Sequence, residues 1–339
     1  MTVSTTTRNA GAAAGAVAAV GAGAAAAKAL LDRRSPSAKY ELRGDEPVAD
    51  GIRRVAAGRA SSALAHLNGE SDVEDDAGAI HEARKDLKKL RSVLRLVREP
   101  LGERLYQREN ERFREAGRLL GGARDAEVKL ETLAALRDRN DGGYPAGGVA
   151  ALVRALEDER ERLSEGLAGE GDGDPRAIAT GRIEAGLEAI PDWELDGDGF
   201  DLIAAGLRRS YSRGRKLYAA TREAPSGENV HEWRKRAKDL RYQLRLVRDA
   251  RKGKLGDAVD QAHELTDHLG DHHDLEVLRA DAAGRPGVVG APNRARLDGM
   301  IDRRQAQLVD QALSIGKRLY EEKPKRFVAR IEGYWTEWR

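Results

Sequence analysis

Two segments of the chain carry histidine, arginine and lysine in the same order and at the same spacing. The first, over 81–98, reads HEARKDLKKLRSVLRLVR, and the second, over 231–248, reads HEWRKRAKDLRYQLRLVR; they agree at 12 of 18 positions. Guanidinium groups grip phosphate oxygens in bidentate fashion, while ammonium groups act as mobile point charges. These residue types, repeated twice, predict a surface that binds a polyanion.

Each repeated segment predicts an amphipathic helix. At about 100° per residue, the basic side chains gather on one face and the leucines on the opposite face. Glu82 and Asp86 are expected on a flank, away from the basic face. Exposed helix faces ordinarily mix charges, because like charges three or four residues apart repel each other. A basic face without acids therefore predicts a bound anion, although a merely solvated basic face remains the alternative.

The composition restricts the class of partner. The chain has 339 residues, 40% of them hydrophobic, and its 59 basic and 57 acidic residues leave a net charge of only +2. A protein with diffuse affinity for nucleic acid is usually more basic, so local concentration of charge favours a defined groove for a compact polyanion. Aromatic residues make up 4% of the chain, which poorly supplies a base-stacking platform. Cysteine is absent, which excludes disulfides and thiol chemistry, and a cytoplasmic location is the default expectation.

The first 38 residues differ from the rest of the chain. Residues 10–27 are almost entirely alanine and glycine, and Lys28 follows them. Alanine and glycine provide little free energy of transfer into a membrane, so 1–38 is predicted to be a disordered tail. A membrane or export segment is the alternative interpretation, and no membrane association is expected.

The remainder predicts an all-α fold with an internal duplication, because no segment shows the alternating pattern of a strand. Half 1 is expected at about 39–190 and half 2 at about 196–339. Outside the repeat, Leu-Gly-Gly-Ala-Arg-Asp-Ala-Glu-Val at 120–128 matches Leu-Gly-Asp-His-His-Asp-Leu-Glu-Val at 269–277. A helix break is predicted at the glycine of each copy. Two four-helix bundles related by a pseudo-two-fold axis would bring both basic helices to one cleft.

The paired His-x-x-Arg-Lys-x-x-Lys-x-Leu-Arg helices, the Leu-Gly segments after them and the Lys-Pro-Lys-Arg-Phe sequence at 323–327 resemble the CHAD family (conserved histidine α-helical domain). The resemblance covers about residues 39–339. It implies two four-helix bundles around a basic cleft that binds inorganic polyphosphate, and in many members association with polyphosphate granules. The binding residues that it implies are His81, Arg84, Lys85, Lys88, Arg91, Arg95, His231, Arg234, Lys235, Lys238, Arg241 and Arg245.

Other residues are candidates for an extension of the binding surface. These are Arg53, Arg98, Arg124, Arg208, Arg209, Tyr242, Arg248, Lys323 and Lys325. Asp125 is expected to cap the helix that follows the first glycine break. A metal site is a weaker hypothesis, in which His263, Asp267, His272 and His273 would meet across the break at Gly270.

The leading functional hypothesis is a polyphosphate-binding protein that does not turn its ligand over. No catalytic constellation and no Glu-x-Glu-x-Lys motif of a CYTH triphosphatase occurs in the sequence, and no cofactor is expected. One alternative is a metal-dependent phosphohydrolase or phosphotransferase that acts on polyphosphate. The other is a nucleic-acid binder that reads shape and backbone alone, although no specific nucleic acid is expected as partner.

Overall fold

The computed structural model describes residues 40–73, 75–121, 123–139, 143–167, 174–195, 197, 199–285 and 287–339, with backbone alone at 123, 124 and 164–167. The predicted tail at 1–38 lies outside these residues. All regular secondary structure in the described ranges is helical, which confirms the all-α prediction. Within the same ranges, no helix is both long and apolar enough to span a bilayer.

Four helices of the first half pack side by side: α2 (Val48–Leu67), α3 (Asp76–Leu96), α5 (Glu103–Leu119) and α8 (Pro175–Ala189). The single turn α4 (Arg98–Leu101) joins α3 to α5. Asp75 starts α3 by accepting a hydrogen bond from the Gly78 amide at 2.7 Å, which satisfies one of the free N–H groups of the first turn. Leu87, Leu90 and Leu94 of α3 are buried in the core, as the periodicity of the repeat predicts.

The second half contains α9 (Asp201–Glu223), α10 (Gly227–Leu246), α11 (Lys252–Gly284), α12 (Ala291–Leu319) and α13 (Pro324–Trp338). The 3₁₀ turns η2 (Ile190–Asp192) and η3 (Arg248–Arg251) lie before α9 and after α10. Ser226 caps α10 through the Asn229 amide, as Asp75 caps α3. Both repeated segments are therefore helices with side-chain caps and buried leucine faces.

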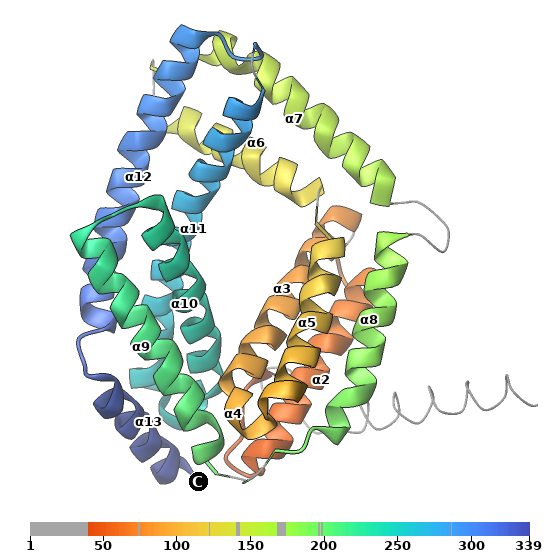
Figure 1. Ribbon diagram of the computed structural model, residues 1–339, viewed down its shortest axis with the longest axis vertical. Helices are drawn as coiled ribbons and strands as arrows, with labels where there is room; N and C mark the ends of the chain where they lie inside the picture. The colour runs from red at the N-terminus through yellow and green to blue at the C-terminus, as the bar shows by residue number, and fades with distance from the viewer. Residues whose placement is uncertain are drawn as a thin grey trace, which may run out of the picture.

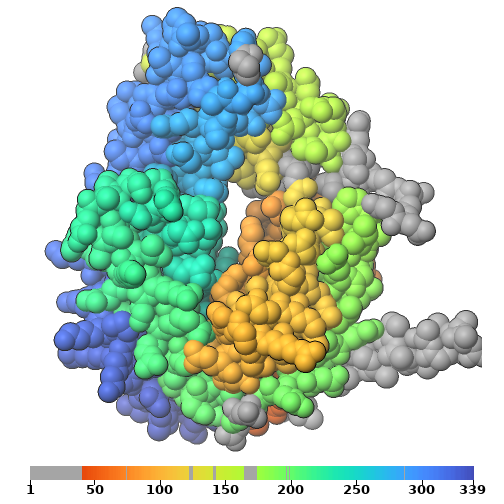
Figure 2. Space-filling view, viewed as in Figure 1, coloured from red at the N-terminus to blue at the C-terminus, as the bar shows by residue number. Residues whose placement is uncertain are grey.

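Two helices of the first half leave its bundle. α6 (Ala123–Asp138) and α7 (Ala146–Leu167) cross to the far ends of α11 and α12 (Figure 1). There they share a second hydrophobic core, separate from the main one, that includes Leu133 and Leu152 of the first half with Leu278 and Ile301 of the second. Figure 2 shows an opening through the molecule, bordered by α10 in teal and by the orange helices of the first half. We call this space the central opening.

The predicted helix break at Gly270 is wrong. α11 runs without interruption from Lys252 to Gly284, whereas the first copy of the motif does separate α5 from α6. A single glycine inside a helix costs only about 1 kcal/mol relative to alanine, and packing against α10 and α12 offsets such a cost. In the first copy a second glycine follows Gly121 in the sequence, and Gly121 lies outside the helices, between α5 and α6.

The two repeat helices touch near their C-terminal ends. The Ser92 hydroxyl donates to the Asp239 carbonyl at 3.1 Å, and the Gln243 amide donates to the Ser92 carbonyl at 3.3 Å. Arg95 of α3 also binds the Asp239 carboxylate at 2.9 Å. From this contact the helices diverge toward their N-termini on either side of the central opening (Figure 1).

Candidate functional site

Four basic residues from the two repeat helices come together on the N-terminal side of the contact between α3 and α10. They are Arg84 and Lys88 of α3 and Arg234 and Lys238 of α10, and we call them the cationic cluster. Lys88 lies close enough to Arg84 and Arg234, and Lys238 close enough to Arg234 and Lys88, for each charge to disfavour the next. The duplicated sequence thus places two like-charged pairs opposite each other, one from each half of the chain.

Both lysines of the cluster hold their protons weakly. Burial, followed by the charges of Arg84 and Arg234, lowers the pKa of Lys88 to about 8. Burial, followed by the charges of Arg234 and Lys88, lowers the pKa of Lys238 to about 7. Solvent reaches the Lys88 side chain, yet protein surrounds it, which is the environment of a concave surface. A group that brought negative charge here would favour both protonated forms.

Arg234 has unused hydrogen-bonding capacity at the centre of the cluster. Its Nε is buried and has no hydrogen-bond partner among the described residues. Burial lowers the pKa of the guanidinium, and the nearby Asp274 partly opposes that shift. A buried donor without an acceptor costs about 1–3 kcal/mol, so a ligand oxygen at this position would be favoured.

Two aspartates face the cluster at equivalent positions of the duplicated motif. Asp125, in the first turn of α6, binds Arg84 at 3.3 Å, and Asp274 of α11 lies near Arg234 and Lys238. Burial raises the pKa of Asp274 overall, although the charges of Arg234 and Lys238 partly oppose this shift. Asp125 was predicted only as the cap of this helix, which is wrong because α6 already begins at Ala123, and no binding role was predicted for Asp274. The repeated Asp-x-Glu-Val pattern was the signal that could have found both.

The repeat histidines lie farther from the contact between the helices. The His231 ring lies 4.7 Å from the ring of His273 on α11, centroid to centroid. Burial lowers the pKa of His231, and burial together with the Arg234 and His231 charges lowers the pKa of His273 to about 4. Both imidazoles are therefore neutral near pH 7. His81 precedes Glu82 on α3; burial raises the pKa of Glu82, but the hydrogen bond from Lys85 and the charges of Lys85 and His81 lower it overall.

The prediction that the basic faces carry no acids is wrong for one lysine in each copy. Lys85 binds Glu82 at 2.6 Å, and Lys235 binds Glu232 at 2.6 Å. In both pairs the acid lies three residues before the lysine, a spacing that brings side chains together on a helix. These lysines are partly neutralised, unlike Lys88 and Lys238, for which no ion pair occurs with any described carboxylate.

The arginines nearer the C-termini of the repeat helices have partners within the protein. Arg91 donates to the Asn110 side chain at 3.1 Å, and burial lowers its pKa to about 10. Arg95 binds Asp239 across the helix contact. Arg241 donates to Thr266 at 3.0 Å and lies 3.7 Å from Asp267, and Arg245 lies 3.9 Å from Glu41. Their predicted role in binding stays a prediction.

Several of the additional candidates stabilise the fold. Arg53 donates twice to the Trp193 carbonyl, Arg98 binds Glu103 through two hydrogen bonds, and Arg209 binds Glu99 and the Arg95 carbonyl. Tyr242 lies among Tyr40, Arg59 and Arg245, and burial raises its pKa. The remaining exposed candidates are Arg208, Arg248, Lys323 and Lys325. The Arg124 side chain lies outside the described residues.

The suggested metal ligands do not come together. His263 binds Asp267 at 2.7 Å one turn along α11, but His272 lies nine residues after His263 on the same continuous helix. That separation is roughly 13 Å at 1.5 Å per residue. No group of three or more histidine or carboxylate side chains in the described part of the chain has the geometry to hold a metal ion.

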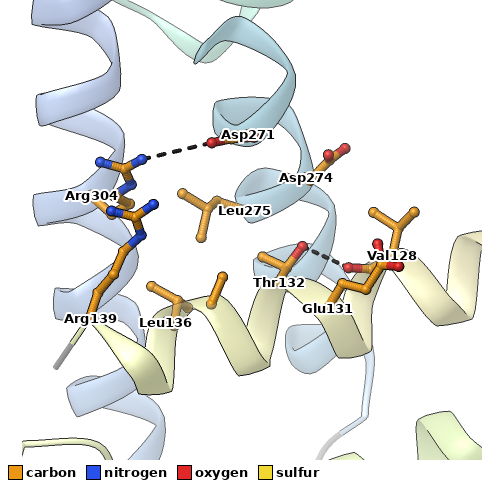
Figure 3. Close-up of a pocket in the computed structure, with 10 residues that line it drawn as sticks. Val128, Glu131, Thr132, Leu136, Arg139, Asp271, Asp274, Leu275 and Arg304 are labelled. Atoms are coloured by element: carbon orange, nitrogen blue, oxygen red, sulfur yellow. Dashed lines mark hydrogen bonds and ion pairs between the residues drawn. The ribbon is translucent and has the colours of Figure 1, made fainter. Parts of the chain in front are cut away.

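A separate pocket of about 190 Å³ lies between α6 and α11 (Figure 3). Val128, Leu136 and Leu275 provide apolar surface, and Asp271 binds Arg304 at 3.7 Å across one end. Glu131 and Asp274 also line it. Three carboxylates and two arginines, Arg139 and Arg304, line the pocket, so it does not suit an anion, and the cationic cluster remains the candidate site.

Comparisons with known proteins agree with this architecture. The family model described as CHAD domain matches residues 58–283. The solved CHAD domain from the plant Ricinus communis superposes with a TM-score of 0.55 at 17% identity, over 89% of this chain and 96% of that one. PptA from Streptomyces chartreusis superposes with a TM-score of 0.55 at 16% identity, over 81% of this chain and 100% of that one.

No curated protein matches the sequence significantly. The two structural neighbours share too little sequence to indicate more than a common fold. The family model rests on the sequence itself and covers most of the chain, including both repeat helices and the motifs that follow them. The chain belongs to the CHAD domain family.

Proposed function

We propose that the protein binds inorganic polyphosphate in a basic cleft between its two halves and does not catalyse turnover of the polymer. The observation that carries this proposal is the cationic cluster, in which Lys88 and Lys238 face each other with lowered pKa values beside an unsatisfied Arg234. Like charges that lie close together repel one another, and an anion between them would offset that repulsion. Membership of the family, which is linked to polyphosphate, supports the same ligand.

A linear phosphate polymer suits the arrangement physically. It has no bases to be read, so recognition requires only closely spaced cations along a track. Successive positions on a helix face provide one cation about every 5 Å. Release of counterions from the polymer would contribute much of the binding free energy, so affinity should fall steeply with salt.

Equivalent residues of the two halves support the pseudo-two-fold arrangement that the sequence predicts. Arg84 with Asp125, and Arg234 with Asp274, occupy matching positions of the duplicated motifs and lie at the same site. Each aspartate would hold its arginine in place and keep a part of the cleft less positive. A polymer that passes between the halves would then meet similar groups on both sides.

Binding without turnover fits the charges near the cluster. Hydrolysis of a phosphoanhydride by metal catalysis needs several carboxylates that can share a cation. Asp125 and Asp274 are the acids next to the cluster, and each has an arginine as its neighbour. An ammonium or guanidinium beside each carboxylate competes with a metal for the same oxygens.

Binding of long-chain polyphosphate at several salt concentrations tests the proposal. Reversal of charge at all four cluster positions (Arg84→Glu, Lys88→Glu, Arg234→Glu and Lys238→Glu) should weaken binding by at least about 100-fold, since four phosphate contacts become repulsive. The matched control reverses four exposed cations away from the cluster: Arg160, Arg162, Arg296 and Arg303. Equal losses in the two variants would show that net charge, and not this site, governs binding.

Two further measurements separate the proposal from its alternatives. Incubation with polyphosphate and Mg²⁺ should release no phosphate, and steady release would identify an enzyme. Duplex DNA should compete poorly at fixed salt, because its width exceeds that of a single phosphate chain. Equal competition would identify a nucleic-acid binder. A cytoplasmic location, on free chains or granules, completes the proposal.

A further inference from the structure

A groove between α3 and α5 adjoins the cationic cluster. It has a volume of about 400 Å³, and the two helices that form it pack side by side (Figure 1). Arg84 and Lys88 of the cluster are part of its wall. The other charged residues that line it are Arg91 of α3 and Arg114, Glu115 and Arg118 of α5. We call this the α5 groove. Because the two sites share Arg84 and Lys88, the α5 groove is continuous with the cluster.

Two further observations place the end of α5 beside basic residues of α3. Burial and the charge of Arg95 lower the pKa of Arg91 most, and the charge of Arg114 adds to this shift. Gly121 follows α5, and a Cβ at this glycine would lie 4.0 Å from the Arg84 guanidinium. The cations of α3 and α5 are therefore close enough to act on one ligand.

The charge of the α5 groove is strongly unbalanced. Among the described residues that line it, five are cations, and Glu115 is the one carboxylate. Arg118 donates to Glu115 at 2.8 Å, and Arg114 lies 3.3 Å from the same carboxylate. Ion pairs on the surface contribute little stability, because water competes with both partners. A phosphate group could therefore replace Glu115 as the partner of these two arginines.

Another acid of α5 shows what a structural ion pair looks like on the same helix. Glu109 is fully buried and binds both Arg108 and Arg112. Arg112 also donates to the Ala185 carbonyl of α8, so this group belongs to the packing of α5 against α8. Glu115 instead keeps 21% of its side chain exposed. A ligand in the α5 groove can reach Glu115, whereas Glu109 is enclosed by the protein.

The second half of the chain does not repeat the cations of α5. Arg118 corresponds to Asp267 and Arg114 to His263, counted back from the matched Leu-Gly sequences at 120 and 269. His263 and Asp267 bind each other at 2.7 Å, and Asp267 lies 3.7 Å from Arg241. The surface beside α10 therefore carries an acid where the surface beside α3 carries an arginine. An anion that extends beyond the cluster is favoured on the side of the first half.

We propose that the α5 groove is a second phosphate-binding segment, which takes the polyphosphate chain from the cationic cluster over the first half of the protein, and that Glu115 competes with the polymer for Arg114 and Arg118. This inference rests on the proposed function. A chain long enough to fill both sites gains a second contact that is intramolecular, so its affinity exceeds that of the cluster alone. Glu115 limits this gain, because its carboxylate must leave the arginines when phosphate binds.

The test measures binding of long-chain polyphosphate to two variants of the full chain. Arg114→Gln with Arg118→Gln should weaken binding by about tenfold and lower its salt dependence, since two phosphate contacts lose their charge. Glu115→Gln should strengthen binding by about threefold, because the internal competitor is removed. Glutamine favours helix about as well as arginine and glutamate do, so both variants should fold.

Matched controls make the same changes at exposed positions away from the groove. Arg296→Gln with Arg303→Gln on α12, and Glu332→Gln on α13, should have little effect on affinity. Changes in these controls equal to those in the α5 variants would overturn the inference, because the groove would then act only through the overall charge of the protein.

The outcomes distinguish this inference from the proposed function. A wild-type protein that does not bind long-chain polyphosphate overturns both. Binding that is lost on charge reversal of the cluster, but unchanged in both α5 variants, overturns the α5 groove alone. A loss in the arginine variant without a gain in Glu115→Gln supports the groove and overturns the competing role of Glu115.

Discussion

The two repeat helices have nearly the same sequence but use their charges differently. In α3, Asp86 is buried and binds Arg59 at 2.8 Å and Lys89 at 3.0 Å. In α10 the corresponding positions are exchanged, with Arg236 in place of Asp86 and Asp239 in place of Lys89. Asp239 binds Arg236 of its own helix and Arg95 of the other repeat helix. One acid thus stabilises a bundle, and its counterpart joins the two halves.

The comparison separates the repeat positions that have the same role in both halves from those whose role is specific to one half. Positions that keep the same residue in both copies form the leucine faces and the cationic cluster, including Arg84 with Arg234 and Lys88 with Lys238. Positions that differ make contacts specific to one half. Ser92, small and buried, lets the helices touch, while Tyr242 at the same place in α10 fills space beside Arg59. Of the charges kept in both copies, those of the cationic cluster lie between the two repeat helices, whereas Arg95 and the two divergent aspartates stabilise the fold.

The largest expected difference between the two repeat helices is the loss of stability when Asp86 or Asp239 is replaced. Asp86→Ala leaves the buried Arg59 and the neighbouring Lys89 without their carboxylate, and an uncompensated buried charge costs about 3–5 kcal/mol. Asp239→Ala should cost about 2 kcal/mol, because Arg95 and Arg236 retain more contact with water. Urea unfolding followed by circular dichroism measures both. Equal costs would show that the burial of Arg59 is not what makes Asp86 important.

The next largest difference is expected between Gly51 and Gly206, which begin the similar sequences Gly-Ile-Arg-Arg at 51–54 and Gly-Leu-Arg-Arg at 206–209. Gly206→Ala would force a methyl group into the backbone of Leu96, which cannot rotate away, and we expect a cost of about 2–3 kcal/mol. A methyl group at Gly51 would meet the side-chain ends of Glu46 and Leu42 at 2.6 and 2.7 Å, and these can shift, so about 1 kcal/mol is expected. Thermal unfolding of the two variants checks the order, and a larger loss for Gly51→Ala would contradict it.

Protonation of the cluster should make binding depend on pH. Lys88 is surrounded by Arg84, Arg234, Asp125 and Asp274, and Lys238 by Arg234, Lys88, Arg241 and Asp274. With pKa values of about 8 and about 7, both lysines lose charge as pH rises from 6.5 to 9.5. Polyphosphate favours the protonated forms, so affinity should fall by about tenfold over this range. Titration calorimetry should also detect proton uptake on binding.

The free protein should respond to pH in the opposite sense. The pKa values of these lysines are lower in the folded state than in the unfolded chain, so the unfolded state binds more protons between pH 7 and 10. Stability should therefore rise with pH in that window while affinity falls. Replacing both lysines with arginine should flatten the two trends, because arginine stays protonated. A parallel rise of affinity and stability would contradict the assignment.

The faces of the repeat helices, and the meeting of these two helices, could be predicted from the sequence. Periodicity placed Leu87, Leu90 and Leu94 in the core, and the duplicated residues predicted the meeting of Lys88 with Lys238. The ion pairs were not predicted where the partner is distant in the sequence: Asp125 is 41 residues from Arg84, and Asp239 is 144 residues from Arg95. Helical spacing and the duplication indicate the faces that the repeat helices share, but which side chains form ion pairs across helices depends on how the helices pack.

The missed continuity of α11 leads to the smallest expected effect. A Cβ at Gly270 would meet nothing within 4 Å, and the residue is helical, so Gly270→Ala should raise the free energy of unfolding by about 0.5–1 kcal/mol through loss of freedom in the unfolded chain. Gly121 lies between α5 and α6, where a Cβ would approach the Arg118 carbonyl at 3.2 Å, so Gly121→Ala should give no gain. Denaturant unfolding of the two single variants measures the difference. Because His273 and Asp274 follow Gly270 on the same rigid helix, the stabilised variant should keep its polyphosphate affinity; a loss of affinity would show that α11 must bend at Gly270 when the ligand binds.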